Sequence, residues 1–311
     1  MSVNFNLLNP NGSFNRQVEV QIKSRPDFWP LMWQNLGDIP DNAIDNFKAH
    51  VLIHFIPVWH NVFGDIEASY AEDITKMLKT ASPFYQQKWA EVLREPTIGH
   101  LNEHTFKDTI KFIGGDLKIP ASAWTVKCGH HLMKFTESLP ADYFIESPLS
   151  RYEQFVEIGA GVGEVARMCL DFVADPRTPR SYHFIDHPSM IRFAKANCQR
   201  HAKYIHGYND VDEMYAAETF SPKKRTLFIA TWSLSEIEIE ARRNIVNKMN
   251  SVNADYLIAF QNDVFGVNNH EYFNTEFISE LGENKRFEFV DIPWIPFNYG
   301  NSYLFVWDKM L

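Results

Sequence analysis

Three glycines at strict alternation, Gly159, Gly161 and Gly163, follow a short apolar run. A helical pattern over residues 164–173 comes directly after them, so the segment predicts a strand, a tight turn and a helix. Glycine tolerates positive φ and lets a ligand approach the main chain closely. The first turn of a helix also offers unpaired N–H groups. A ligand at this turn is therefore expected to contact backbone more than side chains.

The spacing of these glycines differs from that of a dinucleotide-binding turn. Such a turn reads G-x-G-x-x-G, and its third glycine lets the helix pack closely on the strand. Here the pattern is E-x-G-x-G-x-G, with Glu157 two residues before Gly159. Many α/β proteins also use a glycine-rich turn for packing alone, and that alternative stays open.

Length, charge and cysteine content limit the class of protein. The 311 residues, 45% of them hydrophobic, allow one large domain or two modest ones. A net charge of −9 argues against a broad nucleic-acid surface, which normally presents a basic face. Cys128, Cys169 and Cys198 form no close pair, so neither a disulfide framework nor a zinc site is predicted.

No targeting or membrane segment is predicted from the pattern. The N-terminus lacks a basic region followed by an apolar core, and no apolar run approaches the length of a membrane span. We therefore expect a cytoplasmic, soluble protein with no nucleic-acid and no membrane partner.

The first 150 residues are rich in Trp, Phe, His and Pro, and they predict short helices over 42–55, 70–93 and 106–112. Prolines limit these helices because proline lacks the N–H and disfavours helix in the preceding residue. We expect a helical N-terminal cap. Its aromatic side chains either fill the core between short helices or line a pocket.

Histidine pairs at helical spacing occur in this cap, at His50 with His54 and at His100 with His104. Neither pair has the H-E-x-x-H form, and no third ligand can be assigned, so no metal site is predicted. A packed or hydrogen-bonded role is expected instead. The Gly-His-His sequence at 129–131 is equally open.

From residue 152 onward, short apolar strands alternate with helices, which predicts a parallel, doubly wound sheet. The expected strands cover 155–158, 181–186, 204–208, 225–231 and 254–260. Two further strands, 287–292 and 303–307, have no helix between them. They must pair antiparallel or lie apart, because a parallel crossover needs a dozen or more residues.

Polar residues follow the ends of these strands, at the edge where open α/β sheets bind ligands. Asp186 ends the second strand, where a carboxylate can accept hydrogen bonds from a ribose diol. It could also cap the next helix, which begins with Pro188. The pattern alone leaves both roles open, and the resemblance described below favours the ribose role. Asn209 and Asp210 follow the third strand, and turn chemistry explains that pair equally well.

The loop after the fourth strand carries Trp232, Ser233, Ser235 and Glu236. Ser233 and Glu236 match the capping box S-x-x-E at a helix start. Such a cap would leave Ser235 and Trp232 freer to face a cleft. Both a cap and a catalytic role are compatible with this pattern.

Glu157 with the three glycines, Asp186, the polar loop and the terminal strand pair together resemble the class I S-adenosylmethionine (SAM) dependent methyltransferases, over about residues 152–311. The resemblance implies a Rossmann-like class I methyltransferase sheet, mostly parallel with a C-terminal antiparallel hairpin. Residues 1–150 would then form a helical cap that binds the acceptor, and residues 151–311 the SAM-binding domain. The block 231–236 and the helical, aromatic N-terminal half are most similar to bacterial sugar O-methyltransferases.

The resemblance also implies site residues. Those expected to bind SAM are Glu157, Gly159, Ala160, Gly161, Gly163, Asp186, His187, Asn209, Asp210, Thr231 and Trp232. Among these, Asn209 or Asp210 would meet the adenine amino group. Acceptor contacts are expected from Ser233, Ser235 and Asn262, and a general base from Glu236 or His270, with His187 behind them.

The first functional hypothesis is methyl transfer from SAM to a hydroxyl of a small molecule, with a sugar or sugar conjugate expected as the acceptor. A second keeps SAM but places the methyl on a nitrogen or on a protein, where a proton-accepting side chain matters less. A third is a SAM-fold binding module without catalysis. A homo-oligomer is left open.

Overall fold

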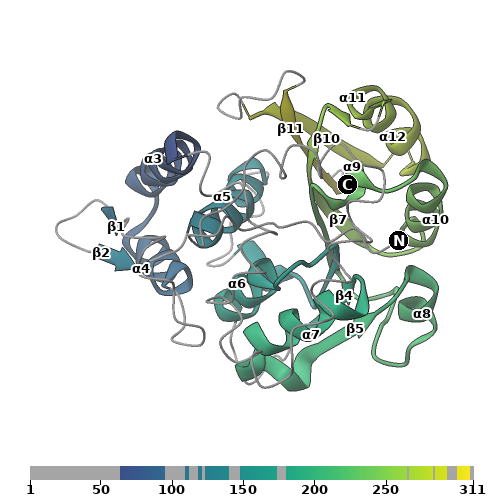
Figure 1. Cartoon of the computed structure of the whole chain (residues 1–311), viewed down its shortest axis with the longest axis horizontal. Helices are drawn as coiled ribbons and strands as arrows, with labels where there is room; N and C mark the ends of the chain where they lie inside the picture. The colour runs from purple at the N-terminus through teal and green to yellow at the C-terminus, as the bar shows by residue number, and fades with distance from the viewer. Residues whose placement is uncertain are drawn as a thin grey trace, which may run out of the picture.

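The computed structural model describes residues 64–94, 109–111, 118–120, 123–139, 148–173, 180–264, 266–282, 284–292 and 300–308. The helix predicted over 42–55 and the histidine pairs at 50/54 and 100/104 lie outside these residues. A seven-stranded sheet forms the centre of the described part (Figure 1). No helix in these described ranges has the length and hydropathy needed to span a membrane.

The sheet has the order β10-β11-β7-β6-β3-β4-β5. Its strands are β3 (Gln154–Ile158), β4 (Ser181–Ile185), β5 (Ile205–Tyr208), β6 (Thr226–Thr231), β7 (Ala254–Gln261), β10 (Lys285–Asp291) and β11 (Asn301–Asp308). The five strands β3 to β7 pair in parallel, whereas β11 pairs antiparallel with both β7 and β10. The expected fold class is confirmed: a mostly parallel α/β sheet with a C-terminal antiparallel pair.

The chain enters this sheet in the middle, and that order creates a switch point. It runs from β3 outward to β4 and β5, then returns to β6 on the other side of β3. The connections after β3 and β6 therefore leave in opposite directions, and open α/β sheets bind ligands at the carboxyl ends of two such strands. The three-glycine turn lies at that position.

Helices cover both faces of the sheet. They are α6 (Glu164–Phe172), α7 (Pro188–Asn197), α8 (Val211–Ala216), α9 (Ser233–Glu236), α10 (Ile239–Met249), α11 (Asn269–Tyr272) and α12 (Ile278–Glu280). Shorter pieces are the 3-10 helices η5 (Pro148–Arg151) and η6 (Gln199–Tyr204), the π-helix η7 (Phe273–Phe277), and the small strands β8 (Asp263–Val264) and β9 (Val267–Asn268). Buried side chains of α8, α10 and η7 form one core cluster with the second face of the sheet.

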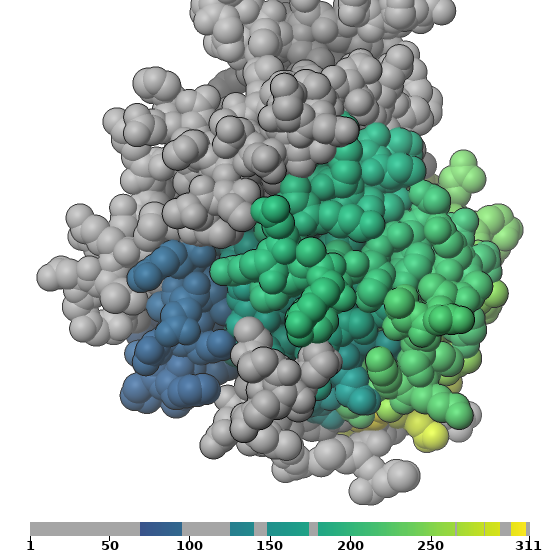
Figure 2. Space-filling model, turned by 90° about the horizontal axis from the view of Figure 1, so that it is seen from below, coloured from purple at the N-terminus to yellow at the C-terminus, as the bar shows by residue number. Residues whose placement is uncertain are grey.

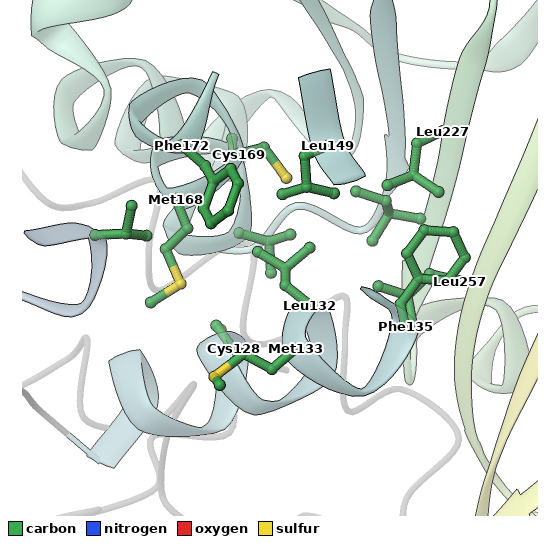
Figure 3. Packing of buried hydrophobic residues seen from close by; sticks show 14 of the residues in the cluster. Cys128, Leu132, Met133, Phe135, Leu149, Met168, Cys169, Phe172, Leu227 and Leu257 are labelled. Carbon is green, nitrogen blue, oxygen red and sulfur yellow. The ribbon is translucent and has the colours of Figure 1, made fainter. Parts of the chain in front are cut away.

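Before the sheet come α3 (Gly64–Thr80), α4 (Pro83–Leu93), the small strands β1 (Thr109–Lys111) and β2 (Lys118–Pro120), and α5 (Ala123–Ser138). Buried residues of α3, α4 and α5 belong to the same core cluster as α6 and the first face of the sheet. Figure 3 shows Leu132 and Phe135 of α5 directed toward Leu227 and Leu257 of the sheet. In the space-filling view the blue residues of this first part lie directly against the green ones (Figure 2).

Two predictions for the first 150 residues change. The pattern over 70–93 forms two helices, because Pro83 starts a new one and the hydroxyl of Ser82 accepts a hydrogen bond from the N–H of Tyr85 at its start. The helix predicted over 106–112 is wrong for Thr109–Lys111, which is a strand paired with Lys118–Pro120. The pairing of those two segments outweighs the helical spacing of the first. Helix α5, which the sequence patterns did not single out, packs on both α3 and α6.

Candidate functional site

The three glycines of the turn after β3 all have positive φ, of 68° at Gly159, 55° at Gly161 and 74° at Gly163. A Cβ on Gly159 would lie 2.3 Å from Cβ of Ser233, and one on Gly163 would lie 2.8 Å from Cα of Ala194. A Cβ on Gly161 would meet nothing within 4 Å among the described atoms. Packing therefore accounts for two of the glycines, and the third faces open space.

Asp186, at the end of β4, holds this turn. Its Oδ2 accepts a hydrogen bond from the N–H of Gly161 at 3.0 Å, and its Oδ1 accepts one from the N–H of His187 at 2.6 Å. Burial raises the pKa of Asp186 to about 6, although these two backbone hydrogen bonds oppose the rise. Each carboxylate oxygen still has a lone pair for a further donor.

The helix-cap alternative for Asp186 is wrong. The N-cap of α7 is His187, whose Nδ1 accepts a hydrogen bond from the N–H of Ser189 at 3.3 Å. Asp186 lies one residue too early for that task, so its carboxylate is directed to the glycine turn.

Glu157 lies within β3 and is 1% exposed. The hydroxyl of Tyr182 donates to its Oε2 at 2.8 Å. Burial raises the pKa of Glu157 to about 8, against the effect of that hydrogen bond. At neutral pH the side chain is therefore a neutral carboxylic acid beneath the turn.

The loop after β6 carries the one residue other than glycine with positive φ among those the structure describes, Trp232, with φ 72° and ψ −35°. Such a backbone costs about 1–3 kcal/mol and persists where its surroundings impose it. The hydroxyl of Ser233 donates to the carbonyl of Ile158, directly below the glycine turn. The hydroxyl of Ser235 donates to the carbonyl of Trp232 at 2.6 Å.

The predicted capping box in this loop is wrong. Helix α9 begins after Trp232 and has no side-chain cap. Ser233 uses its hydroxyl on β3, and Glu236 is the last residue of this four-residue helix. Ser235 is fully buried and its hydroxyl is engaged, and its contact with an acceptor stays a prediction.

Glu236 is half-buried at the end of α9, and Nε2 of Gln261 donates to its Oε1 at 3.5 Å. The buried guanidinium of Arg242 holds the same loop from behind, because it donates to the carbonyls of Ser235 at 2.6 Å and Ile237 at 2.8 Å. These hydrogen bonds to backbone carbonyls hold the loop in place. Thr231, the last residue of β6, is half-buried beside it.

His270 is not brought to this group. It is exposed on α11, and its ring lies 5.1 Å from that of Phe289 on the outer strand β10. Phe289 packs against the core cluster on the second face of the sheet, whereas Trp232 packs against the cluster on the first. Asn262 is engaged with β11, where the hydroxyl of Ser302 donates to its Oδ1 at 2.9 Å.

Asn209 and Asp210 have different roles in the structure. Oδ1 of Asp210 accepts a hydrogen bond from the N–H of Glu213 at 2.8 Å and caps α8, as the turn alternative predicted. Asn209 is exposed just after β5, and its backbone N–H donates to Oε2 of Glu213 at 2.8 Å. Of the two, the Asn209 side chain is the better placed for a ligand.

Two residues of α5 that were not assigned to the site lie near Trp232. Nζ of Lys127 is 4.7 Å from the centre of the Trp232 ring, and the ring of His131 is 6.0 Å from it. Burial lowers the pKa of Lys127 to about 8, which Cys128 and Glu236 oppose. His130 lies next to His131 and is also buried. The Gly-His-His sequence at 129–131 was the one signal in the sequence for these residues. Because no helix was predicted over this segment, the side chains could not be placed relative to the sheet.

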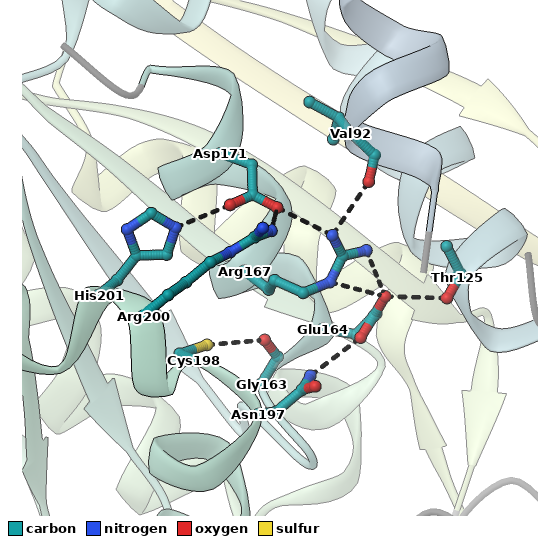
Figure 4. Close-up of polar contacts among 10 residues, drawn as sticks. All are labelled: Val92, Thr125, Gly163, Glu164, Arg167, Asp171, Asn197, Cys198, Arg200 and His201. Atoms are coloured by element: carbon teal, nitrogen blue, oxygen red, sulfur yellow. Dashed lines mark hydrogen bonds and ion pairs between the residues drawn. The ribbon is translucent and has the colours of Figure 1, made fainter. Parts of the chain in front are cut away.

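A buried polar network supports the helix that follows the turn (Figure 4). We call it the Glu164 network: Thr125, Glu164, Arg167, Asp171 and Asn197. Oε1 of Glu164 accepts from Nη2 of Arg167 at 2.6 Å and from Thr125 at 2.8 Å, and its Oε2 accepts from Asn197 at 2.9 Å. These contacts join α5, α6 and α7 around the start of α6.

Within the described ranges no three His, Cys, Asp or Glu side chains come together as a metal site. The three cysteines are free and buried. Burial raises the pKa of each thiol, so none is a reactive thiolate.

No family model and no curated protein matches the chain. Solved structures do match at low identity. The CurJ carbon methyltransferase is 16% identical over 61% of this chain and 56% of its own, with a TM-score of 0.41. The N-methyltransferase NodS from Bradyrhizobium japonicum WM9 is 14% identical over 59% of this chain and 95% of its own, at 0.37. The methyltransferase domain of bacterial CtHen1 is 14% identical over 51% and 91%, at 0.38.

Proposed function

We propose that the chain is a SAM-dependent methyltransferase that methylates a hydroxyl of a small molecule, with a sugar or sugar conjugate as the acceptor. The observation that carries the proposal is Gly161. It has a left-handed backbone, no described atom within 4 Å of where a Cβ would stand, and an N–H held by the carboxylate of Asp186. It lies at the switch point of the sheet, where such folds bind ligands.

The residues at this position fit SAM in kind. The open side of Gly161 is a cradle that a side chain would fill, and Asp186 offers acceptor lone pairs to a ribose diol. Asn209, at the end of β5, would face the adenine. Glu157 would lie below the amino-acid end as a neutral hydrogen-bonding group at pH 7.

SAM would supply a sulfonium methyl for transfer in line to a nucleophile. The protein's own task is to hold an acceptor hydroxyl in line and to accept its proton, since positioning can contribute very large effective molarities. The loop at Trp232 and the start of α5 supply the side chains for that task. Burial lowers the pKa of Lys127 to about 8, and its Nζ lies 4.7 Å from the centre of the Trp232 ring, so it can contribute positive charge beside them.

Calorimetric titration with SAM and with S-adenosylhomocysteine tests the cofactor. The informative variant is Gly161→Ala, which strains the backbone and fills the open side. Gly282→Ala is its matched control, because Gly282 also has positive φ, of 81°, and also has nothing near its Cβ among the described atoms. Gly282 follows α12 and precedes β10, which is an outermost strand of the sheet, whereas Gly161 follows the inner strand β3.

Both variants are expected to lose about 1–2 kcal/mol of stability from the left-handed backbone. We expect Gly161→Ala alone to weaken SAM binding, by at least tenfold. Absence of SAM binding to the unmodified chain would refute the cofactor. Binding without transfer to any of a panel of nucleotide sugars, free sugars, phenols and amines would favour the non-catalytic module, and transfer to amines alone would refute the hydroxyl acceptor.

A further inference from the structure

A line of buried polar groups runs from α3 to the edge of the Trp232 loop. Nε2 of His130 lies 2.9 Å from Oδ2 of Asp73, and Nδ1 of His130 lies 2.8 Å from the hydroxyl of Tyr303. Nδ1 of His131 lies 2.6 Å from that same hydroxyl. We call these four residues the His131 relay. Both histidines are at most 1% exposed.

The carboxylate at one end fixes every proton in this line. The hydrogen bond from His130 and the neighbouring Lys134 hold the pKa of Asp73 at about 2, so Asp73 is ionised and only accepts. His130 must therefore donate from Nε2. Burial lowers the pKa of His130, so the ring is neutral and its Nδ1 is an acceptor.

The remaining protons follow from Tyr303. Its one O–H proton goes to Nδ1 of His130, and its oxygen is then free to accept from Nδ1–H of His131. With the proton on Nδ1, the neutral ring of His131 carries a lone pair on Nε2. That Nε2 is buried and has no hydrogen-bond partner among the described residues.

The neighbouring ring of Trp232 carries a second unpartnered atom. Nε1 of Trp232 is also buried without a partner among the described residues, and the two rings meet edge to face at 6.0 Å. One atom donates and the other accepts. Each costs about 1–3 kcal/mol when left unpaired, which a hydroxyl placed between them would recover, since it can accept from one and donate to the other.

We propose that His131 is the catalytic base of the transfer, and that Asp73, His130 and Tyr303 position it and fix its tautomer. The inference rests on the proposed function. As the acceptor oxygen forms its bond to the methyl carbon, its O–H proton passes to Nε2 of His131. The bond from that carbon to sulfur breaks with its electron pair on sulfur, leaving a neutral thioether, the methyl ether and an imidazolium.

The groups around His131 agree with this role. Burial, and then Lys127 and His130 on α5, lower the pKa of His131, and Tyr70 of α3 meets its ring edge to face at 6.0 Å. The ring is thus neutral before reaction. The hydroxyl of Tyr303 accepts from its Nδ1–H and orients the ring, and the carboxylate of Asp73 orients that hydroxyl through His130.

Nitrogen-15 NMR of histidine-labelled protein tests the tautomers without any acceptor. We expect opposite tautomers on the two neighbouring rings, Nε2–H on His130 and Nδ1–H on His131. Through-bond connection to the backbone assigns the signals, and the His130→Asn and His131→Asn spectra check them. A proton on Nε2 of His131 in the unmodified chain would overturn the inference. Tyr303→Phe should release His131 into a mixture of tautomers.

Turnover then separates this inference from the proposed function. With SAM and the panel described above, His131→Asn should lower kcat about 10²- to 10⁴-fold while SAM binding stays within twofold. Asp73→Asn should lower kcat less and change its pH profile. His206→Asn, on β5 and stacked on the ring of His183, is the control and should leave kcat unchanged.

Each outcome decides one of the two. Full turnover in a folded His131→Asn variant overturns the role of His131 and leaves the methyltransferase proposal standing. Loss of SAM binding in the unmodified chain refutes the methyltransferase proposal. If no acceptor in the panel reacts, or if His131→Asn does not fold, the tautomer of His131 in the unmodified chain decides.

Discussion

Two buried polar networks lie on the α5 face of the sheet, and they end differently. In the Glu164 network, both oxygens of Glu164 have donors, and the guanidinium of Arg167 also reaches Asp171 at 2.9 Å and the carbonyl of Val92 at 3.0 Å. The His131 relay is a single line whose last atom, Nε2 of His131, has no partner within the described ranges. The central carboxylate and guanidinium of the first network are fully paired, and only Oδ1 of Asn197 at its edge lacks a partner among the described residues, whereas the second network ends on an unpaired ring nitrogen beside Trp232.

The two networks also differ in whether their side chains can both donate and accept hydrogen bonds. The Glu164 network is built on an arginine, which donates and cannot be deprotonated, so it holds fixed geometry and fixed charge. The His131 relay contains histidine and tyrosine, which both donate and accept. A closed network of fixed donors suits the support of the glycine turn. An open line of groups that exchange roles suits proton transfer.

The largest expected effect is on the closed network. Arg167→Met should lower the free energy of unfolding by about 3–5 kcal/mol, because it leaves the buried carboxylate of Glu164 without its cation. Urea denaturation measures the loss. The control is Arg243→Met, which removes an exposed ion pair to Glu276 at 2.8 Å and should cost less than about 1 kcal/mol. Equal losses in the two variants would refute the supporting role of the network.

Glu157 tests what happens to a buried carboxyl that lacks a cation. Its pKa is raised from 4.5 to about 8, so the folded state retains a proton that the unfolded state has lost. The resulting stability is complete below pH 4.5 and is lost as pH rises toward 8, by up to about 1.4 kcal/mol per pH unit. Glu157→Gln should abolish this slope and keep the stability measured at low pH. An unchanged slope, in denaturant titrations across this range, would show that another group causes it.

The elements that are encoded within one continuous segment could be predicted from the sequence. Strands β3 to β7, the turn at Gly159–Gly163 and the terminal pair are each encoded within one segment, by apolar runs and turn residues. The end of β4 could be placed too, so Asp186 was assigned correctly to the edge that faces the turn.

The relay could not be predicted, because its members are far apart in the chain. Asp73, His130 and Tyr303 meet only when α3, α5 and β11 pack on one face, and spacing carries no signal for that contact. The capping box failed for a related reason. Ser233 matched a local motif, but its hydroxyl is used by the carbonyl of Ile158, on another strand.

Asp186 gives a prediction of intermediate size, on binding. Its pKa of about 6 makes the ionised acceptor dominant at pH 7 and scarce at pH 5. If the carboxylate holds a ribose diol, SAM affinity should fall about tenfold from pH 7 to pH 5, in proportion to the ionised fraction. Calorimetry at several pH values measures this. Asp186→Asn should bind weakly at both pH values and show no such dependence, whereas a pH-independent affinity in the unmodified chain would remove Asp186 from the site.

The smallest expected effect is at the open end of the relay. Trp232→Phe removes an N–H that has no partner among the described residues, and this gain offsets the packing lost with the smaller ring, so the net change in the free energy of unfolding should be no more than about 1 kcal/mol. The same substitution at Trp89 should cost more, about 1–3 kcal/mol, because that side chain is fully buried against Phe172 in the closed core and leaves a cavity. Thermal and urea unfolding compare the two variants.

The order of the two effects should reverse in turnover. Trp232→Phe loses a donor to the acceptor hydroxyl and raises KM, whereas Trp89→Phe leaves KM unchanged. Trp232→Phe with the stability loss of Trp89→Phe and an unchanged KM would mean that Trp232 serves packing, and that the open end of the relay faces no acceptor.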